Sequence, residues 1–86
     1  MSAKDLIDQG TVDPTDAEAV YQLMVASTGF FKQAYDRFPD HNGDQAGDAA
    51  DLIMDETEHW FSVTFPAADF ELIRDEIYEK IHAGLT

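Results

Sequence analysis

Apolar side chains recur at intervals of three and four residues along three stretches of the chain. This spacing places them on one face of an α-helix, whereas a half-buried strand would alternate at every second residue. The longest stretch has an apolar face made of Ala17, Val20, Tyr21, Met24, Thr28, Phe31, Ala34, Tyr35 and Phe38. The periodicity therefore predicts an all-α fold.

The expected helix ends follow from capping and helix-breaking residues. Asp13 followed by Pro14 suits the start of the long helix, and Gly29 is a candidate kink within it. Pro66 suits the first turn of the last helix, and Gly84 suits its end. We expect a small bundle of three longer helices plus a short N-terminal helix, at residues 3–9, 14–38, 46–62 and 67–83.

The two later helices have their own predicted inward faces. In the third helix this face is Ala49, Leu52, Ile53, Trp60 and Val63, and in the last it is Phe70, Ile73, Ile77 and Ile81. Residues 60–65 also alternate in the manner of a short strand. Because a lone strand has no partner for pairing, we expect helix running into a loop there.

Length and composition predict a single domain over residues 1–86. Hydrophobic residues make up 44% of the chain, which is enough for one core, and the absence of cysteine excludes disulfides and thiolate chemistry. No stretch resembles a secretion signal or a membrane span. We expect a cytoplasmic protein without a cofactor.

The strongest compositional feature is a formal net charge of -13. Such a chain repels nucleic acid and anionic lipid, so neither a direct nucleic-acid partner nor a membrane is expected. Self-repulsion of this size costs stability, and two explanations compete. Either a basic protein partner compensates the charge, or a solvent such as concentrated salt requires it.

One helix carries a row of carboxylates at intervals of four, three, four and three residues. Residues three and four apart are neighbours on a helix surface, so these side chains form one acidic stripe opposite the apolar face. Such a row can occupy the basic groove that another protein uses for DNA or RNA. The row is Asp44, Asp48, Asp51, Asp55 and Glu58, and we expect Asp69, Glu76 and Glu79 on the last helix to join it.

In size and charge the chain resembles the small acidic phage inhibitors of restriction and CRISPR systems, some of which mimic nucleic acid. The resemblance implies an inhibitor that works in the host cytoplasm and binds a basic, nucleic-acid-binding protein. It assigns no role to any individual residue.

A second pattern lies in the turn before the third helix. Oxygen side chains occur at positions one, three, five, nine and twelve of a loop, as in an EF-hand calcium site: Asp40, Asn42, Asp44, Asp48 and Asp51. Position six, where that site needs glycine for a sharp turn, is Gln45. We therefore expect a capped turn that does not hold calcium tightly.

Glu56 and His59, like Glu79 and His82, have the spacing of ligands in di-iron helical bundles. Glu79 is predicted to face water. Glu56 falls on the apolar face, where we expect a partner such as Arg74, Lys32 or a tyrosine hydroxyl, with a metal as the alternative. His41 is expected to be exposed.

Four apolar side chains lie away from the main stripes of their helices: Leu23, Phe30, Met54 and Phe61. Either the short first helix covers them, or they form an interface, in which case a homodimer is possible.

No nucleophile motif or phosphate-binding loop occurs, so we expect a non-enzymatic binding protein, in the first instance an inhibitor. The alternative is a salt-adapted structural or oligomerisation module, and a third hypothesis is a metal-binding helical protein.

Overall fold

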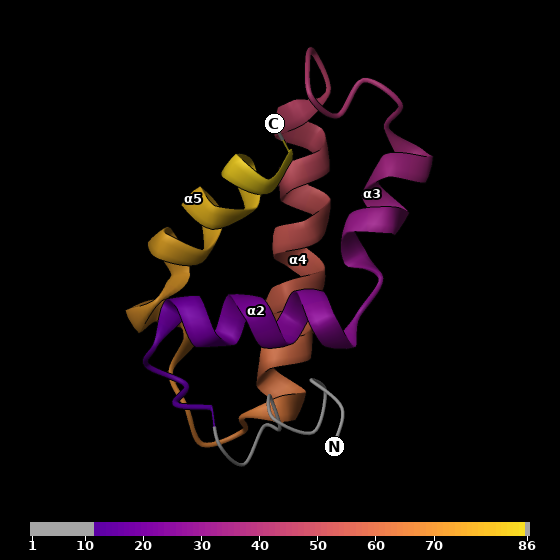
Figure 1. The fold of residues 1–86 in the computed structure, drawn as a ribbon. Helices are drawn as coiled ribbons and strands as arrows, with labels where there is room; N and C mark the ends of the chain where they lie inside the picture. Colours follow the sequence, from indigo (N-terminus) through magenta and orange to yellow (C-terminus); the bar gives the residue numbers. More distant parts are fainter. Residues whose placement is uncertain (1–11, 86) are drawn as a thin grey trace.

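The computed structural model describes residues 12–85, and their regular elements are all helices (Figure 1). The elements are α2 (Ala17–Ser27), α3 (Phe30–Arg37), α4 (Ala46–Thr64), the short 3-10 helix η1 (Phe70–Leu72) and α5 (Arg74–Leu85). The all-α prediction is thereby confirmed. The helix predicted over residues 3–9 lies outside the described residues. Within the described range, no helix has the length and apolarity needed to cross a membrane.

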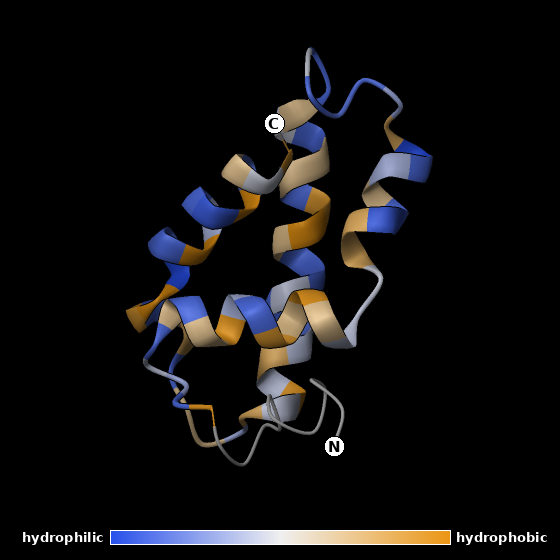
Figure 2. Cartoon of the chain, viewed as in Figure 1, coloured by the Kyte–Doolittle hydropathy of each residue, from blue (hydrophilic) through white to orange (hydrophobic). Residues whose placement is uncertain are grey.

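Helix α4 is the central element, because α3 and α5 both pack along it (Figure 1). Helix α2 runs across the direction of α4 and packs against α5. The interior is made of fully buried side chains from α2, α4 and α5, among them Met24, Ile53, Phe61, Ile77 and Ile81. Figure 2 shows the hydrophilic segments of α5 on its side away from α4. Burial of these apolar faces is the main force that holds the helices together.

The predicted helix over residues 14–38 is in fact two helices, separated at Thr28 and Gly29. Thr28 is extended, with φ −130° and ψ 168°, and its backbone N–H and hydroxyl both donate to the carbonyl oxygen of Met24, at 3.0 and 2.7 Å. These two hydrogen bonds to one carbonyl oxygen hold Thr28 in its extended conformation, which ends the helix. Gly29 follows with the low helix propensity of glycine. The expected kink is a complete break.

The same segment also begins later than predicted. Asp13 accepts hydrogen bonds from the backbone N–H and the hydroxyl of Thr15, at 2.9 and 2.7 Å, and so forms a local turn instead of a helix cap. Asp16 then caps α2 by accepting from the backbone N–H of Ala19 at 3.3 Å.

The later helices also differ from the prediction at their ends. Helix α4 continues to Thr64, so the alternation over residues 60–65 is helical. The predicted last helix over residues 67–83 is replaced by a turn at Pro66, the 3-10 helix η1 and α5. Asp69 causes this division, because its carboxylate accepts from the backbone N–H of Glu71 at 3.1 Å and begins η1. Gly84 lies inside α5.

The predicted apolar faces hold for most positions, with corrections at the edges. Val63 is 68% exposed and not part of the core. Leu23, Met54 and Phe61 are 6%, 4% and 1% exposed, and Phe30 is half-buried. Leu23, Met54 and Phe61 are therefore part of the core, whereas Phe30 packs against it and stays partly accessible. The first helix that was expected to cover these four residues lies outside the described residues.

Candidate acidic surface

The predicted acidic row lies on the exposed side of α4. Asp48, Asp51, Asp55 and Glu58 project from the helix, and all are exposed. At a rise of 1.5 Å per residue, the ten residues from Asp48 to Glu58 span about 15 Å. Asp44 is exposed but precedes the helix, and its backbone N–H donates to the Asp40 carboxylate at 2.9 Å. Four of the five carboxylates therefore share one helix, and the fifth extends the row into the turn.

Two side chains of α5 reach this row, which sequence reasoning did not anticipate. The Tyr78 hydroxyl donates to Asp51 Oδ1 at 3.2 Å, and Arg74 Nη1 forms an ion pair with Glu58 Oε2 at 3.0 Å. Arg74 and Tyr78 are four residues apart and therefore lie on one side of α5. Each also follows a core residue, Ile73 or Ile77, in the sequence. This placement was the sequence signal that Arg74 and Tyr78 lie close to α4. Within the described residues, the negative charge of the row is thus compensated at Glu58 alone, and Asp51 accepts a neutral hydrogen bond.

Both donors, Tyr78 and Arg74, have a raised pKa, for different reasons. Burial, and then the negative charge of Asp51, raise the pKa of Tyr78, so the phenol stays protonated and able to donate. The hydrogen bond to Glu58 raises the pKa of Arg74. Arg74 is 42% exposed and Glu58 50% exposed at their side chains, so solvent screens the pair and its contribution to stability is small.

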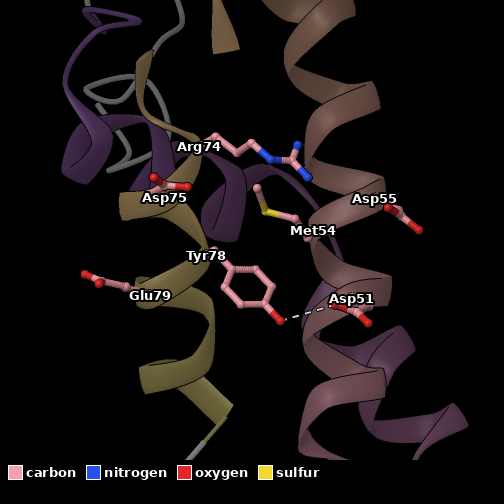
Figure 3. Close-up of a pocket in the computed structure, with 7 residues that line it drawn as sticks. All are labelled: Asp51, Met54, Asp55, Arg74, Asp75, Tyr78 and Glu79. Atoms are coloured by element: carbon pink, nitrogen blue, oxygen red, sulfur yellow. Dashed lines mark hydrogen bonds between the residues drawn. The ribbon is translucent and has the colours of Figure 1, made fainter. Parts of the chain in front are cut away.

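Between α4 and α5 lies an open cleft of about 670 Å³. Figure 3 shows Arg74 and Tyr78 reaching from α5 towards α4, with Met54 between the two helices. Glu79 points away from α4 on the far side of α5, and Asp55 points away from α5. These two carboxylates therefore lie on outer surfaces and do not converge inside the cleft.

The additional acids predicted to join the row have different positions. Glu76 and Glu79 are exposed on α5, as expected for Glu79. Asp69 is exposed, but it precedes η1 and serves as its cap. Glu76 and Glu79 therefore place exposed acids on a second helix, with Glu79 on the side of α5 away from the row, whereas Asp69 belongs to the loop at the far end of α4.

The basic side chains of the described residues are almost all engaged within the chain. Lys32 pairs with Asp36 at 2.9 Å and Lys80 with Glu18 at 2.6 Å, in addition to the Arg74 pair. The guanidinium of Arg37 lies 5.7 Å from the centre of the Phe38 ring. The hydrogen bond between Lys80 and Glu18 raises the pKa of the lysine and lowers that of the glutamate. Of these bases only Arg74 contacts the row on α4, at Glu58, and Asp48, Asp51 and Asp55 have no ion-pair partner within residues 12–85.

The turn proposed as a calcium loop is closed by its own hydrogen bonds. Asp40 accepts from the backbone N–H of Asp44, its backbone carbonyl accepts from Gly43 and Gln45 at 3.0 Å each, and its backbone N–H donates to Gln45 Oε1 at 3.0 Å. Among residues 12–85, no three acidic, histidine or cysteine side chains are close enough together to hold a metal ion. The arrangement is a capped turn whose Asp40 carboxylate already has a partner.

Two single-residue expectations are corrected. His41 is half-buried, because its ring stacks on Tyr35 with 4.1 Å between centroids and its Nδ1 lies 3.1 Å from the Phe38 carbonyl oxygen. Glu56 is half-buried but has no hydrogen-bond or ion-pair partner within residues 12–85. Its expected partners, Arg74 and Lys32, pair with other carboxylates.

Compared with protein-family models, with curated proteins and with solved structures, the chain gives no match. The chain is a small, acidic protein whose regular elements over residues 12–85 are all helices.

Proposed function

We propose that this protein is a non-enzymatic inhibitor that binds a basic, nucleic-acid-binding surface of another protein through α4 and the adjoining side of α5. The single observation that carries the proposal is the exposed carboxylate row on α4, in which no lysine or arginine of α4 lies between the acids and only Glu58 has an ion-pair partner among the described residues. A mimic of nucleic acid, of the anti-CRISPR or anti-restriction type, is the narrower form of the proposal.

The packing of α4, which carries the row, favours this function. Helix α4 packs against α3 on one side and α5 on another, so its carboxylates start from a fixed backbone. Preorganised charge loses little conformational entropy on binding, and it steers a positively charged partner towards the surface. Asp48 and Asp55 have no hydrogen bond or ion pair from a side chain in the described residues, so both remain available to a partner.

The best test is affinity capture from the source cell at low and high salt, with two double variants that carry equal net charge. Asp48→Asn with Asp55→Asn alters the row, whereas Glu18→Gln with Asp36→Asn removes two exposed carboxylates elsewhere, each paired with a lysine, so the melting temperature of both variants is measured first. We expect association with the captured basic protein to slow on the order of tenfold for the row variant only. Nucleic acid should displace the wild-type protein from the same target. Equal binding of both variants at physiological salt contradicts the proposal.

The alternative, a salt-adapted structural or oligomerisation module, has one observation in its favour: acidic side chains are exposed on every longer helix, including Glu18 on α2 and Asp36 on α3. Burial of Leu23, Met54 and Phe61 removes three of the four apolar side chains that were to mediate oligomerisation, and Phe30 is half-buried. Under this alternative, molar salt stabilises the fold strongly. The row variant and the control variant then bind any partner equally well.

A further inference from the structure

An apolar groove of about 530 Å³ lies at the C-terminal end of α4, opposite the turn that contains Asp40. Its lining includes Pro14, Phe65, Pro66, Ala68 and Leu72. Phe65 is 9% exposed, and its ring lies 5.1 Å from that of the core residue Phe61. The floor of the groove is therefore continuous with the hydrophobic core, and its walls contain two prolines whose backbone is restricted.

Leu72 stands at this groove and is 69% exposed. The backbone holds it there, because Leu72 N–H donates to the Asp69 carbonyl at 3.3 Å and the next N–H, of Ile73, donates to the Phe70 carbonyl at 3.0 Å. A large apolar side chain fixed in solvent beside an apolar groove does not contribute to folding. Such a patch is typical of a contact with another molecule.

The charges beside the groove define that molecule. Four exposed acids lie at the groove: Asp69 lines it, and Asp13, Asp16 and Glu71 are each next in sequence to a lining residue. None of the four forms an ion pair in the described residues. A second copy of this chain would bring a further net charge of -13 against them, which is unfavourable. A segment with an apolar side chain between lysines or arginines matches both the groove and its rim.

We propose that this groove receives an apolar side chain from a basic segment of the partner protein, as a second contact beyond the acidic row. The inference rests on the proposed function for the identity of the partner, but it assigns a separate site. Phe65 follows Glu58, at the end of the row, by seven residues and is the C-cap of α4, so the two lie about 10 Å apart along the helix axis. One partner can therefore reach both.

The test uses two synthetic peptides and the full-length protein. One peptide has two leucines flanked on each side by two lysines, and the other has serines in place of the leucines. Binding is followed by NMR through the amide signals of Ala67, Ala68 and Leu72. We expect the leucine peptide to bind at least about tenfold more tightly, as expected for burial of one large apolar side chain. The preference should persist at high salt, because screening weakens only the charge contacts.

Two matched variants locate the site. Leu72→Ser should abolish the preference for leucine, whereas Val63→Ser, at a position that is 68% exposed and outside the groove, should leave it intact. Both side chains are exposed, so neither change should unfold the protein. Equal affinity for the two peptides, absence of binding, or a preference that survives Leu72→Ser overturns the inference.

Other occupants give distinct results. A second copy would appear as concentration-dependent sedimentation that Leu72→Ser removes, and the chain's own first residues would appear as a shift of the Leu72 signal in a full-length Leu6→Ser and Ile7→Ser variant. Either result overturns the inference. The proposed function is judged separately, because it fails when the Asp48 and Asp55 variant keeps its affinity for the cellular target.

Discussion

The Tyr78 hydroxyl donates a hydrogen bond to the carboxylate of Asp51, which joins α5 to the acidic row of α4. This contact is exposed and 3.2 Å long, so we expect Tyr78→Phe to lower the free energy of unfolding by no more than about 1 kcal/mol. Thermal unfolding followed by circular dichroism measures the change. A loss several times larger would mean that the hydroxyl has a structural role beyond this bond.

Two aspartates of the same row should differ in their effect on stability. Asp48 lies in the first turn of α4, where the helix dipole favours a negative charge, whereas Asp55 lies between Asp51 and Glu58 at spacings of four and three. We expect Asp55→Asn to stabilise the protein by roughly 0.4–1 kcal/mol at low salt, and Asp48→Asn to give no gain. The comparison uses melting temperatures. The difference should disappear at high salt, and a gain that is equal for both variants contradicts the dipole argument.

Gly84 and Gly47 form a second matched pair. A Cβ atom at Gly84 would lie 2.6 Å from the Tyr21 hydroxyl oxygen and 3.0 Å from two ring atoms of Phe31, whereas at Gly47 nothing lies within 4 Å. We expect Gly84→Ala to destabilise by about 1–3 kcal/mol, because overpacking outweighs helix propensity. Gly47→Ala, within α4, should stabilise by up to about 1 kcal/mol. Denaturant unfolding of both variants tests the prediction, which fails if Gly84→Ala is neutral.

The Asp40 turn should not bind calcium tightly, because its carboxylate already accepts the Asp44 N–H. Calorimetric titration with calcium and with magnesium should show no micromolar site. Asp40→Ala should instead destabilise the protein by about 0.5–2 kcal/mol, the usual range for loss of a side chain that caps the backbone. Micromolar calcium affinity that Asp40→Ala removes would restore the metal-binding hypothesis.

Stability should decline at both ends of the pH range. The pKa of Glu18 is lowered by its hydrogen bond to Lys80, and that of Asp13 by the Thr15 backbone N–H, so both contributions are present above the unfolded pKa values of 4.5 and 3.8 and are lost as pH falls. Burial raises the pKa of Tyr21 and Tyr78, so their contribution is complete below pH 10.0 and is lost as pH rises through the folded values. Chemical denaturation across pH measures both effects. Glu18→Gln should reduce the loss of stability at acid pH, and Tyr78→Phe should reduce the loss at alkaline pH.

The sequence was sufficient for helix type and core faces because a period near 3.6 residues is a local property, as the burial of Ile73, Ile77 and Ile81 illustrates. The break at Thr28 was missed because it depends on a hydroxyl bonding to the carbonyl of Met24, which propensity does not reveal. The acidic row could be predicted from spacing along one helix. The pairing of Glu58 with Arg74, sixteen residues away, could not, because it depends on how α4 and α5 pack.

The break at Thr28 and Gly29 also bears on the order in which the chain assembles. Neighbouring helices α3, α4 and α5 meet through contacts between segments close in sequence, whereas α2 reaches α5 across 62 residues, as in the Glu18 and Lys80 pair. Loop-closure entropy makes the distant contact slower to form. We therefore expect α3, α4 and α5 to associate early during refolding and α2 to dock last, with Thr28 and Gly29 as its hinge. Destabilising changes in α2 should then accelerate unfolding while leaving the refolding rate nearly unchanged.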